Sequence, residues 1–181
     1  KTVLFLGRIT LQKGPDYFIY AARRVADIMP DTRFVIAGSG DMEPFIIEKA
    51  AELGISDKVI FAGPLKGEQV DWAYQMADLY VMPSVSEPFG ITPLESLRNN
   101  VPVIVSKQSG VSEVLSHALK VDFWDTDEMA NKIISVLSYA ELGHELRQNG
   151  SREVRTFSWS GPAGKCIDTY NNTIMQESSK R

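Results

Sequence analysis

The sequence predicts an α/β fold in which six parallel strands form a doubly wound sheet, with helices at the C-terminal end. Three observations support this prediction. Short apolar runs rich in β-branched residues recur along the chain, amphipathic helical patterns separate them, and no further run follows residue 139. Continuous apolar runs are typical of parallel strands, because helices cover such strands on both faces. Regular alternation of strand and helix favours right-handed crossovers within one sheet.

The six expected strands are all short apolar runs followed by polar or glycine-containing loops. Runs of this length fit strands better than buried helices, which usually extend over about ten residues or more. The loops matter for function, because ligands of open α/β sheets bind outside the carboxyl ends of the strands. The runs are Val3–Leu6, Phe34–Ala37, Val59–Phe61, Leu79–Met82, Val103–Val105 and Leu119–Val121.

Helical patterns fill the intervals between these runs. In the first interval, Phe18, Ala21, Ala22, Val25 and Ile28 recur at helical spacing and form one apolar stripe. After Tyr139 the strand patterns stop, and two helices complete the chain. The expected helices are Asp16–Met29, Glu43–Leu53, Gly67–Met76, Pro93–Arg98, Ser112–Leu115, Thr126–Tyr139, Ala140–Arg155 and Ser160–Met175.

The length of the chain suits one domain with a sizeable core. We expect this domain over residues 1–176, with residues 140–176 as its helical end and a polar tail, 177–181, that frays. Because the chain opens directly in an apolar strand run, we also expect it to be excised from a larger protein.

Composition excludes several classes of function. The net charge of −4 argues against a nucleic-acid partner, since such proteins show a basic face. No apolar stretch reaches the roughly 20 residues that span a bilayer, so no integral membrane segment is expected. Cys166 is the only cysteine, so no internal disulfide can form and a cytoplasmic location is expected.

The segment Ser84–Ser96 carries the richest chemistry. It follows the fourth apolar run and enters a helix. Thr92 before Pro93 predicts a helix start at which Thr92 caps and Pro93 takes the first helical position. Gly90 lets the backbone approach a ligand closely, and the amides of Gly90, Ile91 and Thr92 then form an anion site at the helix end.

Two acids, Glu87 and Glu95, flank this anion site. A loop of such composition before a helix also occurs where no ligand binds, and Glu95 could be an ordinary first-turn acid that the helix dipole favours. The segment alone leaves both interpretations open.

A second loop, Gly7–Gly14, follows the first expected strand and holds Arg8 and Lys13. Arginine binds phosphate oxygens through its forked guanidinium, and lysine acts as a mobile point charge. Taken alone, such a loop is more often one with two solvated basic residues. It is not a P-loop, because the spacing Gly-x-x-x-x-Gly-Lys-Ser/Thr is absent.

No metal site is expected. The segment Asp125–Asp127 has the Asp-x-Asp form that binds metal in some enzymes, but Asp125 three residues before Glu128 is typical of a helix cap. His117 and His144 have no partner at ligand spacing.

The aromatic residues away from the loops are expected to pack. Trp72 and Tyr74 share an expected helix with Val70 and Met76, which indicates a place in the core. Two further tryptophans lie near element ends and are expected to fix the packing there: Trp124 and Trp159.

The two loops belong to a series of five motifs in a fixed order. The series is Gly7-Arg8 with Lys13-Gly14, then Ala37–Gly40, then Val59–Gly63, then Glu87 with Gly90 and Glu95, then Pro102 with Gly110 and Glu113. It covers nearly the whole chain and resembles glycosyltransferase family four, retaining enzymes of the GT-B fold that include bacterial glycogen synthases, sucrose synthases and mannosyltransferases. The closing Phe157–Trp159 and Tyr170 resemble the last helix of that family.

This resemblance implies that the chain is the Rossmann-like donor-binding domain, one half of a GT-B fold. The full enzyme would transfer a hexosyl group from a nucleotide-diphosphate sugar to an acceptor saccharide or other hydroxyl compound, with retention of anomeric configuration and with no metal or other cofactor. The N-terminal domain that would hold the acceptor is absent from this chain. Alone, the chain is therefore expected to bind nucleotide and to turn over slowly or not at all.

The resemblance also implies roles for particular residues. Arg8 and Lys13 would neutralise the departing diphosphate, and Glu87 would face hydroxyls of the donor sugar; these three are the expected catalytic residues. Glu95 would accept hydrogen bonds from the ribose. The remaining expected donor-binding positions act through their backbone or through close approach, and they are Gly7, Gly38, Leu65, Gly90, Ile91 and Thr92.

Two departures from the family pattern are visible. Asn99-Asn100 stands where a small residue and glycine are common, and Ser109-Gly110 stands where Gly-Gly is frequent, so the sugar pocket is expected to differ there. Glucose from ADP-glucose or UDP-glucose is the favoured donor, on the similarity of Glu87–Ile91 to glycogen-synthase-like members. A GT-B epimerase, a phosphorylase and a non-catalytic nucleotide-binding module stay open as alternatives.

Overall fold

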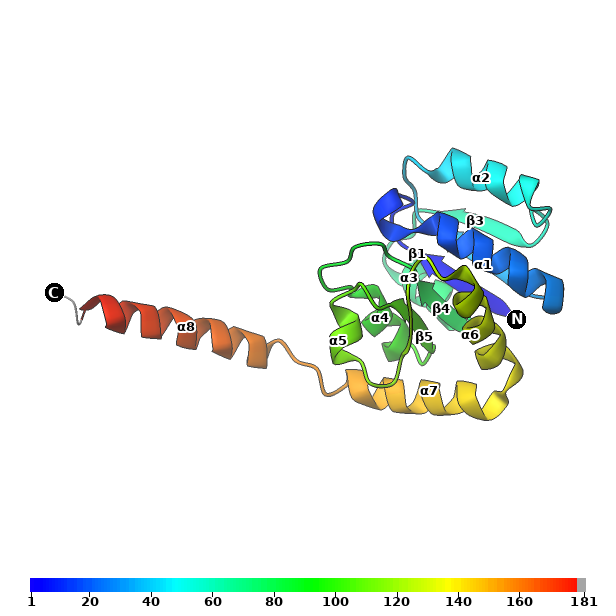
Figure 1. Cartoon of the computed structure of the whole chain (residues 1–181). Helices are drawn as coiled ribbons and strands as arrows, with labels where there is room; N and C mark the ends of the chain where they lie inside the picture. Colours follow the sequence, from blue (N-terminus) through cyan, green and yellow to red (C-terminus); the bar gives the residue numbers. More distant parts are fainter. Residues whose placement is uncertain (179–181) are drawn as a thin grey trace.

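Six parallel strands form one sheet in the order β3-β2-β1-β4-β5-β6 (Figure 1). The structure, a computed structural model, describes residues 1–178, and of 176–178 only the backbone. The strands are β1 (Thr2–Leu6), β2 (Arg33–Ala37), β3 (Val59–Gly63), β4 (Leu79–Met82), β5 (Val103–Ser106) and β6 (Leu119–Val121). The predicted doubly wound parallel sheet is confirmed. Its strand order reverses between β1 and β4, where open α/β sheets bind their ligands.

The strands extend slightly beyond the apolar runs, because main-chain pairing continues past the end of each run. Gly63 pairs with Ala37 after a shift of register, and Ser106 pairs with Val121. The functional loops after β3 and β5 therefore begin later than hydrophobicity alone indicates.

Helices cover both faces of the sheet. The first, second and sixth helices pack on one face, the third, fourth and fifth on the other, and the seventh packs against the fourth and sixth. The sequence pattern missed a short 3₁₀ helix, η1 (Leu11–Lys13). The α-helices are α1 (Pro15–Ile28), α2 (Glu43–Glu52), α3 (Glu68–Gln75), α4 (Thr92–Arg98), α5 (Val111–Val114), α6 (Thr126–Ser138), α7 (Ala140–Val154) and α8 (Ser160–Ser178).

Alternate residues of the central strand β1 serve the two halves of the core. Val3 and Phe5 join the apolar cluster under α1 and α6, whereas Leu4 joins the cluster under α3 and α4. Phe18 of α1 packs against Phe5 and Phe34 with ring centroids 5.6 and 6.1 Å apart. This close packing holds the sheet as a fixed base from which the loops project.

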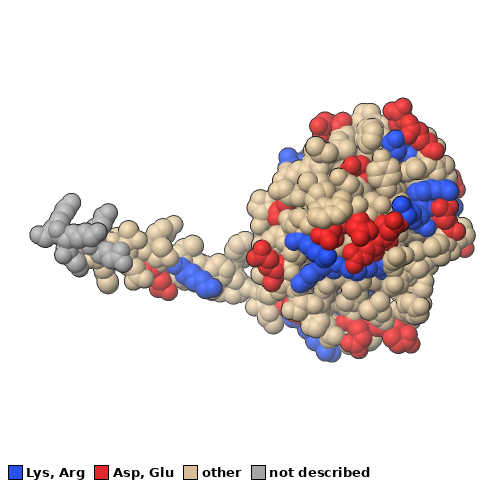
Figure 2. Space-filling model, viewed as in Figure 1, with Lys and Arg blue, Asp and Glu red and all other residues tan. Residues whose placement is uncertain are grey.

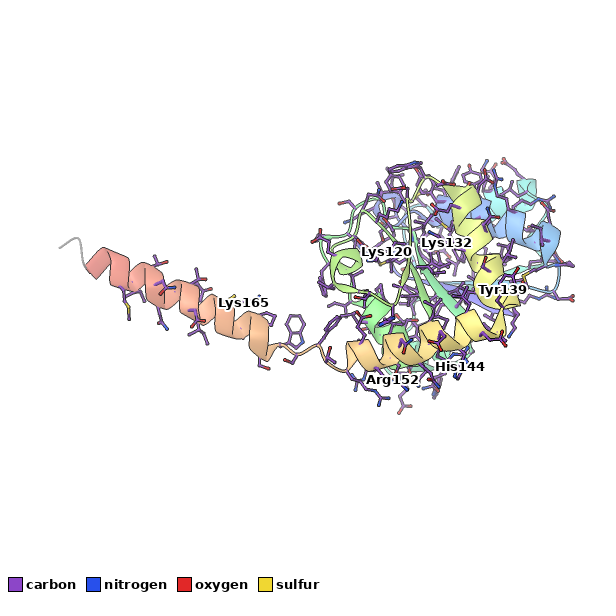
Figure 3. The ribbon with its side chains drawn as sticks, turned by 60° about the horizontal axis from the view of Figure 1, so that its bottom comes forward. Lys120, Lys132, Tyr139, His144, Arg152 and Lys165 are labelled. Atoms are coloured by element: carbon purple, nitrogen blue, oxygen red, sulfur yellow. The ribbon has the colours of Figure 1, made fainter. Side chains whose placement is uncertain are left out.

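Helix α8 stands apart from this layered body as an extended rod, and Lys165 lies on it beyond the edge of the body (Figures 1 and 3). It continues to Ser178, so residues 177 and 178 are helical rather than part of a frayed tail, and residues 179–181 lie outside the described residues. Trp159, just before α8, is 78% exposed. The prediction that Trp159 fixes packing is therefore wrong, because the chain leaves the body at this point.

The prediction of a buried Trp72 is also wrong, whereas Tyr74 is fully buried as expected. The buried stripe of α3 follows helical spacing through Val70, Ala73, Tyr74 and Ala77. Trp72 lies off this stripe and is largely exposed. Residues 70, 72, 74 and 76 alternate as on a strand, so a helix places Trp72 on another face than Tyr74. Trp124 is more than half exposed and touches Phe123 edge-on.

The expected cap of α6 is present. The Asp125 side chain accepts a hydrogen bond from the backbone amide of Glu128 at 2.8 Å. No hydrogen bond from the Asp125 amide to the Glu128 side chain forms in the described residues, and Glu128 pairs with Lys132 instead. Lys132 also donates to the carbonyl of Lys120, which joins α6 to β6 (Figure 3).

Charged side chains of both signs are interspersed over the face seen in Figure 2, and no broad basic field covers it. A nucleic-acid surface would show such a field. Among the described residues, no helix has the length and apolarity to cross a bilayer.

Gly38 is the glycine that the fold needs most. Its φ is +146°, and a Cβ there would lie 1.8 Å from the carbonyl oxygen of Gly7. We predict that Gly38→Ala lowers the free energy of unfolding by about 3 kcal/mol, because backbone strain adds to a clash with main chain. Gly54→Ala, with φ +69° and no atom within 4 Å of its Cβ, is the control for strain alone and is expected to lose about 1 kcal/mol. Urea unfolding measures both, and equal losses would contradict the clash.

Candidate functional site at the carboxyl edge of the sheet

The loop after β1 and the loop after β4 are joined by their main chains. The carbonyl of Gln12 accepts a hydrogen bond from the amide of Val85 at 2.9 Å. Gly14 lies so close to Pro83 that a Cβ at Gly14 would be 2.3 Å from the Pro83 carbonyl oxygen, and its φ is +64°. Only glycine meets both conditions without strain. This contact, which we term the loop junction (residues 12–14 with 83–85), brings the two predicted site loops together.

The loop junction carries an ion pair between Lys13 and Glu87. Lys13 ends η1 and donates to Oε2 of Glu87, and the two side chains are only 22% and 12% exposed. Partial burial limits screening, so this pair interacts more strongly than an ion pair on the surface. Two of the three predicted catalytic side chains are therefore in direct contact.

Arg8, the third predicted catalytic residue, is exposed on the same loop. Its guanidinium donates to Oε1 of Gln12 at 3.0 Å. This bond joins Arg8 to Gln12 of the loop junction, and among the described residues Arg8 forms no ion pair with Glu87. Its charge stays available to a ligand that binds at the edge of the sheet.

The loop after β4 is also tied to the loop after β5. Glu87 and Ser109 form a parallel bridge, with the Gly110 amide donating to the Glu87 carbonyl at 3.0 Å. A Cβ on Gly110 would be 2.2 Å from the carbonyl oxygen of Pro88, so a glycine is needed there. The loop that holds Glu87 is thus paired on both sides, to the loops after β1 and β5.

The turn at Gly90 leads into α4. Its φ is +101°, which a side chain rarely adopts, and the Cβ position is crowded by Glu87, Met82 and Val111. Among the described residues, the amides of Gly90, Ile91 and Thr92 donate to no acceptor. These amides are therefore free, as expected, and their role as an anion site stays a prediction.

Thr92 itself has a role different from the one expected. Helix α4 begins at Thr92, Ile91 occupies the cap position in a helical conformation, and no side chain caps the helix. The Thr92 hydroxyl instead accepts a hydrogen bond from Tyr80 at 2.8 Å. The prediction that Thr92 caps α4 is wrong, because a buried tyrosine of β4 takes up the hydroxyl.

Glu95 lies on the first turn of α4, apart from the Lys13–Glu87 pair. Its Oε2 accepts a hydrogen bond from the Tyr74 hydroxyl at 3.1 Å. Glu95 and Arg98 line two adjoining hollows. One, of about 690 Å³, is mostly apolar and extends toward Phe89 and Trp159; the other, of about 540 Å³, is polar and lies toward Asp71. Glu95 therefore borders space on both sides of α4.

The remaining predicted positions lie in the adjoining loops. Gly7 donates its amide to the carbonyl of Ala37, and Gly38 donates to the carbonyl of Gly63 at 2.8 Å. Leu65, in the loop after β3, packs its side chain against the apolar cluster under α3 and α4. The structure thus links the loops after β1, β2 and β3 in sequence across the edge.

Sequence reasoning missed two contributors to this site, Gln12 and the Tyr74 hydroxyl. Gln12 was one unremarkable residue between two cations. Tyr74 was assigned to the core, which is correct for its ring. A buried tyrosine usually finds a partner for its hydroxyl, and that general rule could have directed attention to it.

The two departures in the sequence have clear structural roles. Asn100 adopts a left-handed conformation with φ +59°, which asparagine tolerates better than most residues. It thereby serves the turn for which glycine is the usual choice. The Ser109 hydroxyl is buried and donates to the Ser106 carbonyl at 2.6 Å, so it braces the loop after β5. Within the described residues, no group of three or more His, Cys, Asp or Glu side chains is placed to hold a metal ion.

Comparison with known proteins agrees with this geometry. The family model "Glycosyl transferases group 1" matches residues 1–153. An uncharacterized glycosyltransferase of Methanocaldococcus jannaschii is 34% identical over 94% of this chain and 44% of its own length. The mannosylfructose-phosphate synthase of Agrobacterium fabrum is 31% identical over 97% of this chain and 41% of its own length. The chain thus spans less than half the length of these relatives.

A solved structure shows which domain of such proteins this chain corresponds to. The C-terminal domain of a glycosyl transferase group 1 family protein from Francisella tularensis superposes with a TM-score of 0.77 and 26% identity, covering 86% of this chain and 84% of that one. The chain therefore belongs to the glycosyl transferases group 1 family, and its fold is that of the C-terminal, donor-binding half of a GT-B glycosyltransferase.

Proposed function

We propose that the loops at the carboxyl edge of the sheet bind the nucleotide-diphosphate sugar of a retaining hexosyltransferase. The observation that supports this most directly is the loop junction, which holds Lys13 against Glu87 beside the available amides of Gly90, Ile91 and Thr92. One edge of the sheet thus offers positive charge and amide donors for phosphates, together with a carboxylate for sugar hydroxyls.

The proposed chemistry follows from charge. Breaking the bond between the sugar and the diphosphate develops negative charge on the departing oxygen and positive charge on the sugar. Arg8, Lys13 and the amides before α4 would stabilise the departing diphosphate, and such fixed electrostatic stabilisation is often the largest contribution to catalysis. With two side-chain cations at hand, no metal ion is required. In a retaining reaction the acceptor then attacks from the face that the nucleotide leaves.

The other roles are assigned by position. Glu87 would accept hydrogen bonds from hydroxyls of the donor sugar, and Glu95 from the ribose. The backbone near Leu65 would contact the base, with Gly7 and Gly38 allowing close approach. We favour glucose as the transferred sugar, from ADP-glucose or UDP-glucose, and a cytoplasmic setting, in which the exposed thiol of Cys166 stays reduced.

The acceptor would bind to an N-terminal domain that these residues do not contain, and the complete protein would be the active enzyme. A nucleotide-sugar epimerase, a phosphorylase and a non-catalytic nucleotide-binding module are the alternatives. An epimerase would release a changed sugar without an acceptor, so analysis of products separates it from a transferase. The loop junction favours a binding site over a scaffold, since a scaffold has no need of a partly buried Lys13–Glu87 pair.

The phosphate role of Arg8 and Lys13 predicts a measurable loss of affinity. Titration calorimetry with UDP, ADP and GDP, in the presence of EDTA, should show binding of one of them. Arg8→Ala and Lys13→Ala should each weaken it about tenfold or more, because hydrogen bonds to charged groups contribute about 1.5–3 kcal/mol. Arg23→Ala is the control, since Arg23 is a half-exposed residue of α1 and pairs only with Asp27 among the described residues.

Binding that requires magnesium would contradict the metal-free mechanism. Equal affinities of wild type and both variants would remove the two cations from the phosphate site. Loss of affinity in Arg23→Ala of the same size would show that the titration reports only net charge.

The role of Glu87 predicts a change in preference rather than in overall affinity. Glu87→Gln should lower the ratio of affinities for the nucleotide-sugar over the plain nucleoside diphosphate by about tenfold, because a carboxylate is the stronger acceptor for sugar hydroxyls. Affinity for the diphosphate itself should not fall, since Lys13 is released from its partner. Calorimetry with UDP-glucose against UDP, or ADP-glucose against ADP, measures the ratio. Glu43→Gln on α2 is the control, and an unchanged ratio in Glu87→Gln would rule out the sugar contact.

A further inference from the structure

Tyr74 connects α3 to the first turn of α4 through a fully buried side chain. Its exposed fraction is 0%, and its ring packs edge-on against Tyr80 with centroids 5.7 Å apart. The hydroxyl reaches two acceptors, Oε2 of Glu95 at 3.1 Å and the carbonyl of Thr92 at 3.2 Å. A single proton is thus shared between the backbone and the carboxylate of the same helical turn.

Toward the residues that the structure describes, the hydroxyl acts only as a donor. Burial raises the pKa of Tyr74 far above its ordinary value, and the neighbouring Tyr80 and Glu95 raise it further. Tyr74 is therefore protonated at neutral pH. A permanent donor on Oε2 fixes one oxygen of Glu95 and the plane of its carboxylate.

The second oxygen of Glu95 is left for other donors. Among the described residues, no group donates to Oε1, and Arg98, one turn along α4, forms no ion pair with the carboxylate. The side chain borders both hollows beside α4. Asn99 provides a second link between the helices, donating to Asp71 and to the Glu95 carbonyl, so the turn beneath the carboxylate is also held.

We propose that Tyr74 is a positioning residue that orients Glu95, so that its free oxygen accepts the ribose hydroxyls of a nucleoside diphosphate and the site prefers ribose to deoxyribose. The inference rests on the proposed function, which assigns Glu95 to the ribose. It explains the preference for ribose over deoxyribose by Tyr74, a core residue that the ligand does not contact.

The physical reason is that a fixed acceptor discriminates and a mobile one does not. A carboxylate held by Tyr74 keeps its free oxygen directed at the ribose, so a deoxy ligand loses a hydrogen bond that the carboxylate does not regain by turning elsewhere. Without the hydroxyl of Tyr74 the carboxylate rotates and is solvated, and the penalty for the deoxy ligand disappears. Tyr74→Phe should therefore change selectivity more than stability.

Calorimetric titration with UDP, ADP and GDP, each beside its 2′-deoxy and 3′-deoxy counterpart, tests this proposal. Wild type should bind the ribose form about tenfold tighter than the deoxy form that lacks the contacted hydroxyl, in line with one hydrogen bond to a charged group. In Tyr74→Phe the ratio should fall to about two or less by the loss of that bond. Affinity for inorganic pyrophosphate should not change.

Tyr80→Phe is the matched control. It removes the same atom from an equally buried ring, but its hydroxyl bonds to the Thr92 side chain rather than to Glu95. Its ratio should stay as in wild type. Thermal melting of both variants shows whether lost stability is similar, in which case stability cannot explain a difference in selectivity.

The outcomes separate the inference from the proposed function. If wild type does not distinguish ribose from deoxyribose, or if Glu95→Ala keeps the distinction, the assignment of Glu95 to the ribose is wrong and the inference is overturned with it. If Glu95→Ala abolishes the distinction but Tyr74→Phe retains the wild-type ratio, only the role of Tyr74 is wrong. A fall in the ratio of Tyr80→Phe equal to that of Tyr74→Phe would also overturn it, because the effect would then be a general one of the aromatic pair.

Discussion

The close approach of Gly14 to Pro83 is the constraint on which the site depends. β1 and β4 are neighbours in the sheet, so the loops that follow them must share a narrow space. The loops fit because Gly14 has no side chain and because Gln12 and Val85 are hydrogen-bonded through their main chains. Lys13 stands between these contacts, so its direction toward Glu87 is set by the backbone on both sides. The ion pair is thus a consequence of strand order.

A second constraint acts on α4 from the core on which it packs. Tyr74 and Tyr80 come from different elements and pack against each other in the core, yet both hydroxyls end on the first turn of α4. The helix therefore rests on two polar contacts within an apolar cluster. Polar groups buried in this way favour one arrangement over its alternatives, because any other orientation leaves a hydroxyl without a partner. The start of α4 and the side chain of Glu95 are placed together.

The sheet, the helices and the loops that hold the site could be predicted from the sequence. The spacing of apolar residues and the order of the elements along the chain determine them directly. The sequence also predicted the amides before α4. It could not show that Lys13 meets Glu87 while Arg8 turns to Gln12, since side-chain partners depend on distances between loops far apart in the chain. Thr92 was predicted as a cap from local preference, and a tertiary contact with Tyr80 overrode that preference. The prediction that Trp72 is buried is wrong for another reason: on a helix, residues two positions apart lie on different faces, so Trp72 does not share the buried face of Tyr74.

The parallel bridge between Glu87 and Ser109 continues strand-like pairing beyond β4 and β5 into the loops that follow them. A loop that is already paired on both sides has little freedom to lose when a ligand arrives. The entropy of ordering, which weakens many loop-based sites, has largely been met during folding. Affinity for the proposed donor should then depend mainly on how well its charges and hydroxyls match fixed groups of the protein. If the proposed transferase needs a large motion during turnover, that motion would lie outside this loop.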